Sequence, residues 1–341
     1  MRAGPVVVGG GVAGCTLLYE LSKRSDKAVL LEAGRVGRQG ASSTPLALLN
    51  PYRGKSAKAT DFDLDALAVT WRLAEELKRE GLEPGLYRSG VYRFAATAKQ
   101  GRNWRNRFER GGVAHGAGDV VRWLEPDTIP PGYRAPFGGF LAAAGGWVHP
   151  YALLTSLLAS AKKRGATVTE ACRVERIISR PDNSEARYRL VTTQGDVDAD
   201  VVILCPGATP NPVLPLPPLE RVAGEVVGFR LDTPLPVPIA GSVYGGQRDS
   251  QVFVGGNHRL PGVPDLGASE QLRRSLSRFI PDLADAPQSS IWSGVRAIGP
   301  DNLPQMAEVS PGLWFVGALA GRGFLASASL ARTLAARLAA R

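Results

Sequence analysis

The sequence predicts an α/β fold in which a nucleotide-binding domain is joined to a second domain built on an antiparallel sheet. Three observations lead to this prediction. The chain begins with a short strand, a glycine-rich turn, a helix and a second strand, an order typical of parallel α/β sheets. A length of 341 residues is too great for one simple core and suits two domains. Strand-like segments fill much of the middle of the chain, and helical periodicity returns at its end.

The glycine turn belongs to a compact unit at the N-terminus. Residues 5–9 form a β-branched strand, residues 12–23 have the apolar spacing of a helix, and residues 27–32 form a second strand that ends at Glu32. The turn has the sequence Gly9-Gly10-Gly11-Val12-Ala13-Gly14, which fits G-x-G-x-x-G. A dinucleotide site is therefore expected at this turn.

Each part of this motif has a physical task. Gly9 permits the tight turn, and Gly11 lets the backbone approach a pyrophosphate at the N-terminus of the helix. Gly14 allows the helix to pack closely on the sheet, and Glu32 can accept hydrogen bonds from both hydroxyl groups of a ribose. The motif does not distinguish NAD from FAD, because Glu32 suits the adenosine ribose of either.

The remaining elements follow from periodicity and from turn residues. Residues 35–52 are rich in Gly, Ser, Thr and Pro, so a loop is expected there despite the apolar residues 46–49. Residues 61–80 have the apolar stripe of a long amphipathic helix. Further helices are expected at 99–110, where the helix is charged, at 151–164, at 269–279 and at the C-terminus, reaching Arg337. Further strands are expected at 91–95, 120–124, 167–178, 188–193, 199–205, 225–231, 239–244, 251–254, 290–297 and 313–316. The proline-dense segment 206–218 is expected to cross between domains.

Composition limits the classes of function. The net charge of +10 invites a nucleic-acid partner, but the arginines are scattered, so nucleic acid is not favoured and a tRNA partner stays open. No apolar run approaches the roughly 20 residues that span a bilayer, and no signal-peptide pattern is present, so we expect a soluble cytoplasmic protein without a membrane span. The three cysteines lack CxxC spacing and the three histidines lack ligand spacing, so no disulfide framework and no metal site are expected.

Three further segments have recognisable patterns. Residues 145–150, Gly-Gly-Trp-Val-His-Pro, fit GG-x-x-x-P, residues 199–208 are similar to A-D-x-V-V-x-A-x-G-A, and residues 292–304 fit W-x-G-x-R…P-D-x-x-P. Together with the N-terminal unit, these segments resemble the D-amino-acid oxidase and glycine oxidase superfamily of FAD-dependent oxidoreductases. The resemblance covers both ends and the middle of the chain, and it is weaker over 61–141 and 215–290.

The resemblance implies a Rossmann-like FAD-binding domain of the GR2 type with an inserted α+β substrate domain on an antiparallel sheet. The implied FAD domain comprises residues 1–60, 142–213 and 291–341, and the substrate domain comprises 61–141 and 214–290. The implied FAD-binding residues are Gly9, Gly10, Gly11, Val12, Ala13, Gly14, Glu32, Ala33, Gly34, Gly40, Ala41, Ser42, Ser43, Val174, Gly207, Ala208, Gly321, Arg322, Gly323 and Phe324. The turn at 320–324 would meet the pyrimidine edge of the flavin, where backbone N–H groups suit the charge of a reduced ring. Non-covalent binding is expected, because the last cysteine is Cys205 and no histidine adjoins the glycine turn.

The same resemblance implies the chemistry. In its amine-oxidising members the substrate gives hydride to flavin N5 and the imine is hydrolysed, so no certain catalytic side chain is expected. Arg296 matches the arginine that binds a substrate carboxylate, although an ion pair within the protein would also explain an arginine there. Tyr244 lies near the sequence position at which relatives have a tyrosine that faces the substrate. The expected substrate is a small amino acid or an N-substituted glycine, with oxygen as the expected acceptor.

Three alternatives stay open. Residues 42–51 depart from the S-x-x-x-G-G pattern, and Gly321-Arg322-Gly323 is similar to the S-R-G turn of flavin domains that modify tRNA, so oxidation of a glycine-like group on RNA is the second hypothesis. A dehydrogenase that passes electrons to another acceptor is the third. A flavin-binding sensor or assembly protein is the non-enzymatic alternative. Substrate identity and oligomeric state are not predicted.

Overall fold

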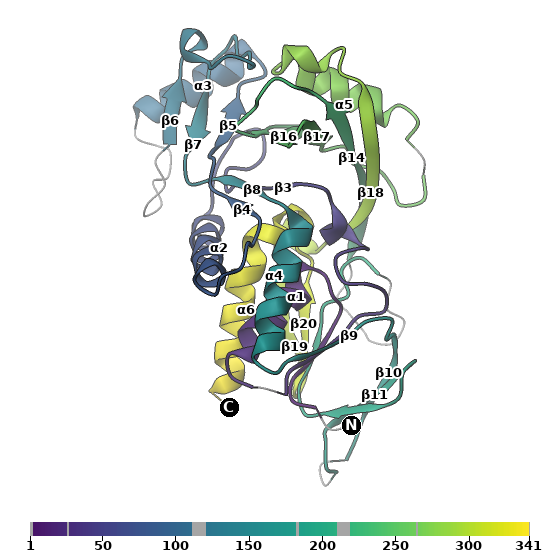
Figure 1. Cartoon of the computed structure of the whole chain (residues 1–341). Helices are drawn as coiled ribbons and strands as arrows, with labels where there is room; N and C mark the ends of the chain where they lie inside the picture. Colours follow the sequence, from purple (N-terminus) through teal and green to yellow (C-terminus); the bar gives the residue numbers. More distant parts are fainter. Residues whose placement is uncertain are drawn as a thin grey trace.

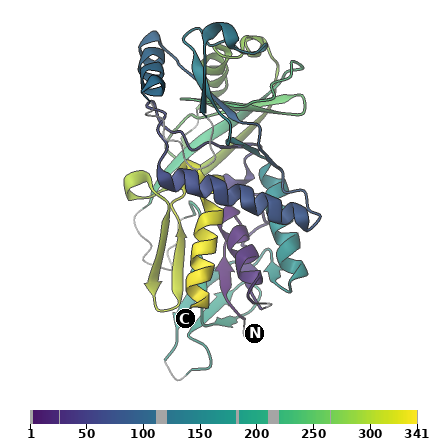
Figure 2. The same cartoon turned by 90° about the vertical axis from the view of Figure 1, so that its left-hand side faces the viewer.

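The structure is a computed structural model that describes residues 3–25, 27–110, 121–181, 184–209, 219–263 and 265–340. Figure 1 shows two regions, with a parallel sheet and long helices in the lower one and a large sheet in the upper one. Both ends of the chain lie in the lower region (Figures 1 and 2). The predicted α/β fold with a Rossmann-like sheet is confirmed.

The lower region is built on a six-stranded sheet. Its strands, in spatial order, are β19 (Gln305–Ser310), β20 (Leu313–Gly317), β13 (Val202–Leu204), β1 (Val6–Val8), β2 (Val29–Leu31) and β9 (Thr167–Thr169). All neighbours are parallel except β19, which pairs antiparallel with β20. The central strands consist of valine, leucine and isoleucine because both faces of the sheet are covered.

Helices cover one face of this sheet and a small sheet covers the other. Helices α1 (Val12–Ser22), α4 (Pro150–Lys163) and α6 (Gly323–Ala339) share one apolar core with side chains from the parallel strands. The antiparallel strands β10 (Val174–Ser179), β11 (Tyr188–Thr192) and β12 (Val197–Ala199) pack against the opposite face. The lower region therefore has three layers.

The upper region is built on an eight-stranded sheet. Its spatial order is β18 (Gln288–Ile298), β14 (Glu220–Arg230), β17 (Gln251–Gly255), β16 (Tyr244–Arg248), β15 (Ile239–Ala240), β5 (Val91–Phe94), β7 (Gly139–Ala142) and β6 (Val121–Leu124). All neighbours are antiparallel except β15 and β5. Helices α3 (Ala98–Glu109) and α5 (Ala268–Ser277) pack in this region. The long pair β14 and β18 extends down towards the lower region (Figure 1).

Smaller elements connect the two regions. Strands β3 (Ala47–Leu49), β8 (Gly146–Val148) and β4 (Leu86–Tyr87) form a three-stranded antiparallel sheet. Short 3-10 helices are η1 (Ala41–Ser43), η2 (Pro126–Thr128), η3 (Pro281–Leu283), η4 (Pro300–Asn302) and η5 (Ala320–Arg322). No helix within the described ranges has the length and apolar character needed to span a membrane.

Two sequence-based expectations about elements were wrong. A loop was expected over residues 46–49, but strand β3 forms there because its backbone pairs with β8, a contact that local sequence does not encode. One strand was expected over 199–205, but the chain forms β12 and β13 there, and these strands belong to different sheets.

Two of the expected domain boundaries fall at elements whose packing points to a different division of the chain. Helix α2 (Asp61–Arg79), expected in the substrate domain, buries its apolar stripe in the same core as α1 and α6, and Figure 2 shows it crossing these helices. The boundary expected at residue 291 falls within β18, which is part of the eight-stranded sheet. We propose that the domain boundaries lie after α2 and after β18.

Candidate cofactor and substrate site

The glycine turn after β1 leaves no room for side chains at two positions. Gly9 has a φ of +111°, and a Cβ atom there would lie 2.3 Å from the carbonyl oxygen of Cys205 on the neighbouring strand. A Cβ atom at Gly14 would lie 1.9 Å from the carbonyl oxygen of Gly9. The turn is thus folded tightly against β13 and the first turn of α1, and no acidic residue occupies that first turn. The N-terminus of α1 is open to an anion.

Glu32 lies at the carboxyl end of β2 and faces this turn. Its Oε2 accepts a hydrogen bond from the backbone N–H of Gly10 at 2.5 Å, and its Oε1 accepts one from Gly34 at 2.7 Å. The backbone N–H of Cys172 donates to the carbonyl oxygen of Glu32 at 2.8 Å. This bond brings the segment before Val174 beside Glu32. The glycine turn, the segment 32–34 and the segment leading to Val174, all expected to bind the cofactor, therefore lie together.

The segment 40–43 lies over the start of α1. It begins at Gly40, which has a φ of +66°, and continues as η1. The Ser42 hydroxyl oxygen accepts a hydrogen bond from the backbone N–H of Val12 at 3.0 Å. Gly207 and Ala208 follow β13 at the same edge of the parallel sheet, because β13 runs parallel beside β1. Ligands of such sheets bind at the carboxyl ends of the strands.

The turn at residues 320–324, near the end of the chain, also approaches the N-terminus of α1. A Cβ atom at Gly323 would lie 3.4 Å from Cγ1 of Val12, so the N-termini of α6 and α1 converge. The Arg322 side chain is buried and turns away from this meeting point: its Nε donates to Oδ1 of Asp63 at 2.9 Å and its Nη1 to the carbonyl oxygen of Asn302 at 2.5 Å. Arg322 therefore holds the turn against α2.

Arg296 and Tyr244 lie near each other on the eight-stranded sheet. Arg296 is on β18, and its Nη2 donates to the carbonyl oxygen of Asn257 at 3.4 Å. It forms no ion pair with a carboxylate in the part of the chain that the structure describes, and burial lowers its pKa. Burial raises the pKa of Tyr244, which a hydrogen bond with Thr44 and the charge of Arg296 partly oppose. The Tyr244 phenol thus lies close enough to Arg296 to interact with its charge, and it contacts Thr44, the residue after Ser43.

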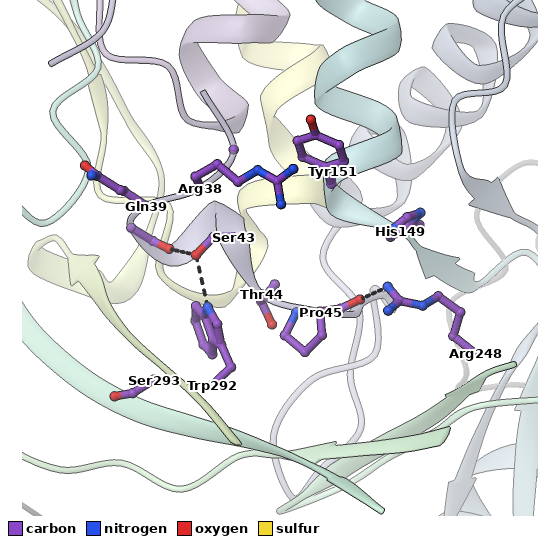
Figure 3. A pocket seen from close by; sticks show the side chains of 12 residues that line it. Arg38, Gln39, Ser43, Thr44, Pro45, His149, Tyr151, Arg248, Trp292 and Ser293 are labelled. Atoms are coloured by element: carbon purple, nitrogen blue, oxygen red, sulfur yellow. Dashed lines mark hydrogen bonds between the residues drawn. The ribbon is translucent and has the colours of Figure 1, made fainter. Parts of the chain in front are cut away.

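A pocket of about 510 Å³ lies beside this segment. Its lining comes from the loop before β3, the start of α4, β16 and β18, and comprises Gly37, Arg38, Gln39, Gly40, Ser43, Thr44, Pro45, His149, Tyr151, Arg248, Trp292 and Ser293. Figure 3 shows Trp292 pointing to Ser43, where Nε1 donates to Oγ at 3.0 Å, and Arg248 bonded to the Pro45 carbonyl oxygen at 2.7 Å. The pocket includes the expected cofactor residues Gly40 and Ser43, but not Arg296 or Tyr244.

The residues present fit an extended dinucleotide cofactor. The glycine turn and Glu32 lie beside the start of α1, and the N-terminus of α6 converges on the same place, an arrangement that suits the pyrophosphate and ribose of a dinucleotide. Sequence reasoning missed Thr44 and Arg53, which face the same region: Arg53 Nη2 is 3.3 Å from the position of a Cβ atom at Gly321. Neither residue carries a local sequence signal, because both are placed by distant contacts.

Comparisons with known proteins agree with this arrangement. A family model described as DAO, FAD dependent oxidoreductase, matches residues 6–337. Glycine oxidase of Geobacillus kaustophilus is 28% identical over 321 residues, which cover 89% of this chain and 83% of the relative. The bifunctional protein MnmC of tRNA 5-methylaminomethyl-2-thiouridine biosynthesis from Maricaulis maris is 28% identical over 338 residues, covering 98% of this chain, and the chain spans only 52% of that protein. The crystal structure of glycine oxidase from Geobacillus kaustophilus superposes with a TM-score of 0.82 at 25% identity, covering 98% of this chain and 95% of that one.

Proposed function

Because the chain belongs to the DAO family of FAD-dependent oxidoreductases, we propose that it oxidises a C–N bond of a small amino acid or an N-substituted glycine. The observation that carries this proposal is Arg296. Its guanidinium is half-buried, has no carboxylate partner among the described residues and shares its surroundings with Tyr244. A guanidinium in this state is suited to a carboxylate from a ligand, because two parallel donors match two oxygens.

The side chains of the site orient the substrate. Arg296 binds the carboxylate, and Tyr244 donates a hydrogen bond to it, because burial raises the pKa of the phenol and keeps it protonated. FAD, when bound, supplies the acceptor for the hydride that leaves the carbon next to nitrogen. The amine is thereby oxidised to an imine, and water hydrolyses the imine to a carbonyl compound and ammonia or an amine. The two electrons and two protons that the amine loses reduce dioxygen to hydrogen peroxide. No side-chain base is required in this scheme.

The cofactor is proposed to be held without a covalent bond. Cys15, Cys172 and Cys205 are all buried, and burial raises the pKa of Cys15 and Cys205, so neither thiol offers a thiolate. Acid precipitation is expected to release all of the flavin colour into the supernatant. Colour retained in the pellet would contradict this part of the proposal.

The assignment of Arg296 is tested by Arg296→Met and Arg296→Lys in the FAD-loaded enzyme. A bidentate bond to a partly shielded carboxylate contributes about 1.5–3 kcal/mol, so the Met variant should lose at least about tenfold in apparent affinity for amino-acid substrates. Lysine should rescue only partly, because it lacks the parallel donors. Anaerobic bleaching of the flavin gives the readout, and flavin content gives the control. Unchanged kinetics in the Met variant would make Arg296 a structural residue.

A second candidate function is oxidation of a glycine-like group on tRNA. The similarity to MnmC over 98% of the chain and the net charge of +10 favour it. The two functions separate when the enzyme is given either N-substituted glycines or tRNA with a carboxymethylaminomethyl group on uridine. Nucleoside mass spectrometry would show loss of that group only if RNA is the substrate, and hydrogen peroxide formation would distinguish an oxidase from a dehydrogenase.

A further inference from the structure

The loop 53–58 is built to hold one side chain in place. It closes on itself through a β-bridge between Arg53 and Lys58. The Arg93 guanidinium, buried on β5, donates to the carbonyl oxygens of Tyr52 at 2.8 Å and Gly54 at 2.6 Å. The backbone on both sides of Arg53 is therefore fixed from the eight-stranded sheet.

Helix α3 fixes the other end of the loop. Arg107 donates from Nη1 to the carbonyl oxygen of Ser56 at 2.5 Å and from Nη2 to that of Ala57 at 3.2 Å. Trp104 donates from Nε1 to the carbonyl oxygen of Lys55 at 3.2 Å. The side chains of α3 and β5 thus satisfy the carbonyl groups of the loop, and none of these bonds uses the Arg53 guanidinium.

Arg53 extends from this loop towards the C-terminal turn. Its Nη2 lies against Gly321, and its half-buried guanidinium has no acceptor or ion pair within the described residues. The pKa of Arg53 is lowered to about 10, first by burial and then by the charges of Arg322 and Arg296, which Asp63 partly opposes. Arg53 therefore lies beside the turn expected to meet the flavin, and the end of β18 that carries Arg296 reaches the same turn through a β-bridge between Ile298 and Leu319.

The nearby carboxylate does not neutralise Arg53. Asp63 is 1% exposed and is engaged by Nε of Arg322 and by the hydroxyl group of Thr60, which donates to its Oδ2 at 2.9 Å. Among the residues that the structure describes, the guanidinium groups of Arg53 and Arg296 are consequently left without a counter-ion of their own. Burying an unpaired charge costs free energy, so a site that keeps two such groups is suited to a ligand with two negative charges.

We propose that Arg53 and Arg296 together bind an amine substrate that carries two carboxylate groups, one at each guanidinium. This inference rests on the proposed function, because Arg296 is taken there as the first carboxylate ligand. The pyrimidine edge of the flavin is a less favoured partner for Arg53, because the N-terminus of α6 already offers backbone N–H groups at that turn. The substrate class is therefore an N-carboxyalkyl amino acid with a second acidic group.

The test compares two inert ligands on the FAD-loaded enzyme. Thiodiacetate carries two carboxylates and (methylthio)acetate carries one, and their dissociation constants are measured from the change in flavin absorbance. We expect the diacid to bind at least about tenfold more tightly. Arg53→Met should remove most of this preference and change the affinity for the monoacid by less than about twofold. Arg53→Lys should restore part of the preference, because charge is kept and the parallel donors are lost.

A matched control is Lys58→Met, which removes one positive charge from the exposed end of the same loop and should leave both dissociation constants unchanged. Equal loss of both ligands in Arg53→Met would overturn the inference. The inference would also be overturned if Arg53→Met changed only the affinity of the flavin for sulfite and neither ligand dissociation constant, because Arg53 would then act on the flavin and not on the substrate. If Arg296→Met kept full affinity for the monoacid, the proposed function would fail, whereas an unchanged diacid preference in Arg53→Met would overturn this inference alone and leave the proposed function standing.

Discussion

Glu32 illustrates how one side chain serves both the fold and the cofactor site. Its two oxygens accept hydrogen bonds from Gly10 and Gly34, which join the glycine turn to the end of β2. Glu32→Ala should raise the dissociation constant for FAD by at least about tenfold, because hydrogen bonds to a charged group contribute about 1.5–3 kcal/mol. Titration of the apoprotein with FAD, followed by fluorescence, measures this change.

The rate constant for substrate bleaching in Glu32→Ala should stay within about twofold of wild type at saturating FAD, because the lost bonds lie at the adenosine end. Glu175→Ala is the matched control, since Glu175 is an exposed carboxylate on β10. A variant that keeps FAD affinity while losing activity would place Glu32 in the chemistry instead.

Asp63 is the second residue with a large predicted effect. Its carboxylate is buried against Arg322 and receives the Thr60 hydroxyl group. Asp63→Asn should lower the free energy of unfolding by about 3–5 kcal/mol, because Arg322 would be left buried without its counter-ion. The urea midpoint measures the loss, and Asp61→Asn, an exposed change in the same first helical turn, should have little effect. Equal midpoints for the two variants would contradict this reading of the ion pair.

At the scale of elements, one carboxylate connects three helices. Glu76 on α2 accepts hydrogen bonds from Lys23 at 2.9 Å, Arg332 at 2.6 Å and Tyr19 at 3.0 Å, so it links α2 to α1 and α6. Burial works to raise the pKa of Glu76, but the bond and charge of Lys23, the charge of Arg332 and the bond from Tyr19 outweigh it, and the pKa is lowered. Helices α1, α2 and α6 therefore share an electrostatic contact around Glu76.

Because the folded-state pKa of Glu76 is lowered, its contribution to stability is present above the unfolded pKa and is lost as pH falls through the folded pKa. Glu76→Gln should lower the free energy of unfolding at pH 7 by about 1–2 kcal/mol. The difference should begin to shrink near the unfolded pKa of about 4.3 and vanish once the pH has fallen through the lower folded-state pKa. Denaturant titrations at several pH values check this. Glu75→Gln, at an exposed neighbouring position, should show no such pH dependence.

Some features of these elements can be predicted from the sequence, and others depend on contacts that form only in the folded chain. Helix α2 is predictable because its stripe repeats over five turns, but its packing against α6 depends on residues some 250 positions away. The glycine turn and Glu32 are predictable because the motif is local. Arg53 is not, since its position depends on Arg93 and Arg107, whose bonds to the loop are formed only in the folded chain.

At the scale of the whole molecule, the proposed cofactor site is assembled from distant parts of the chain. The glycine turn, the segment after β13 and the turn before α6 all meet at one edge of the parallel sheet. Ligand binding to such a site couples these parts, because only the folded arrangement presents them together.

FAD should therefore stabilise the entire lower region. At a free concentration about 100-fold above its dissociation constant, it should add about 2.7 kcal/mol to the free energy of unfolding. Urea denaturation of the apoprotein and of the FAD-loaded protein measures this gain. FMN, which lacks the AMP part of FAD, should give no comparable gain; equal stabilisation by FMN would show that the glycine turn does not bind the cofactor.

The strand order of the six-stranded sheet has a consequence for biosynthesis. The central strand β1 and its neighbour β2 are made first, yet β20 joins β13 only after more than 300 residues have been translated, and α6 covers α1 later still. A nascent chain on the ribosome therefore carries the glycine turn long before the elements that complete its surroundings exist. Cofactor loading must wait until translation has passed α6, and until then the apolar face of α1 needs protection by a chaperone or by transient non-native contacts.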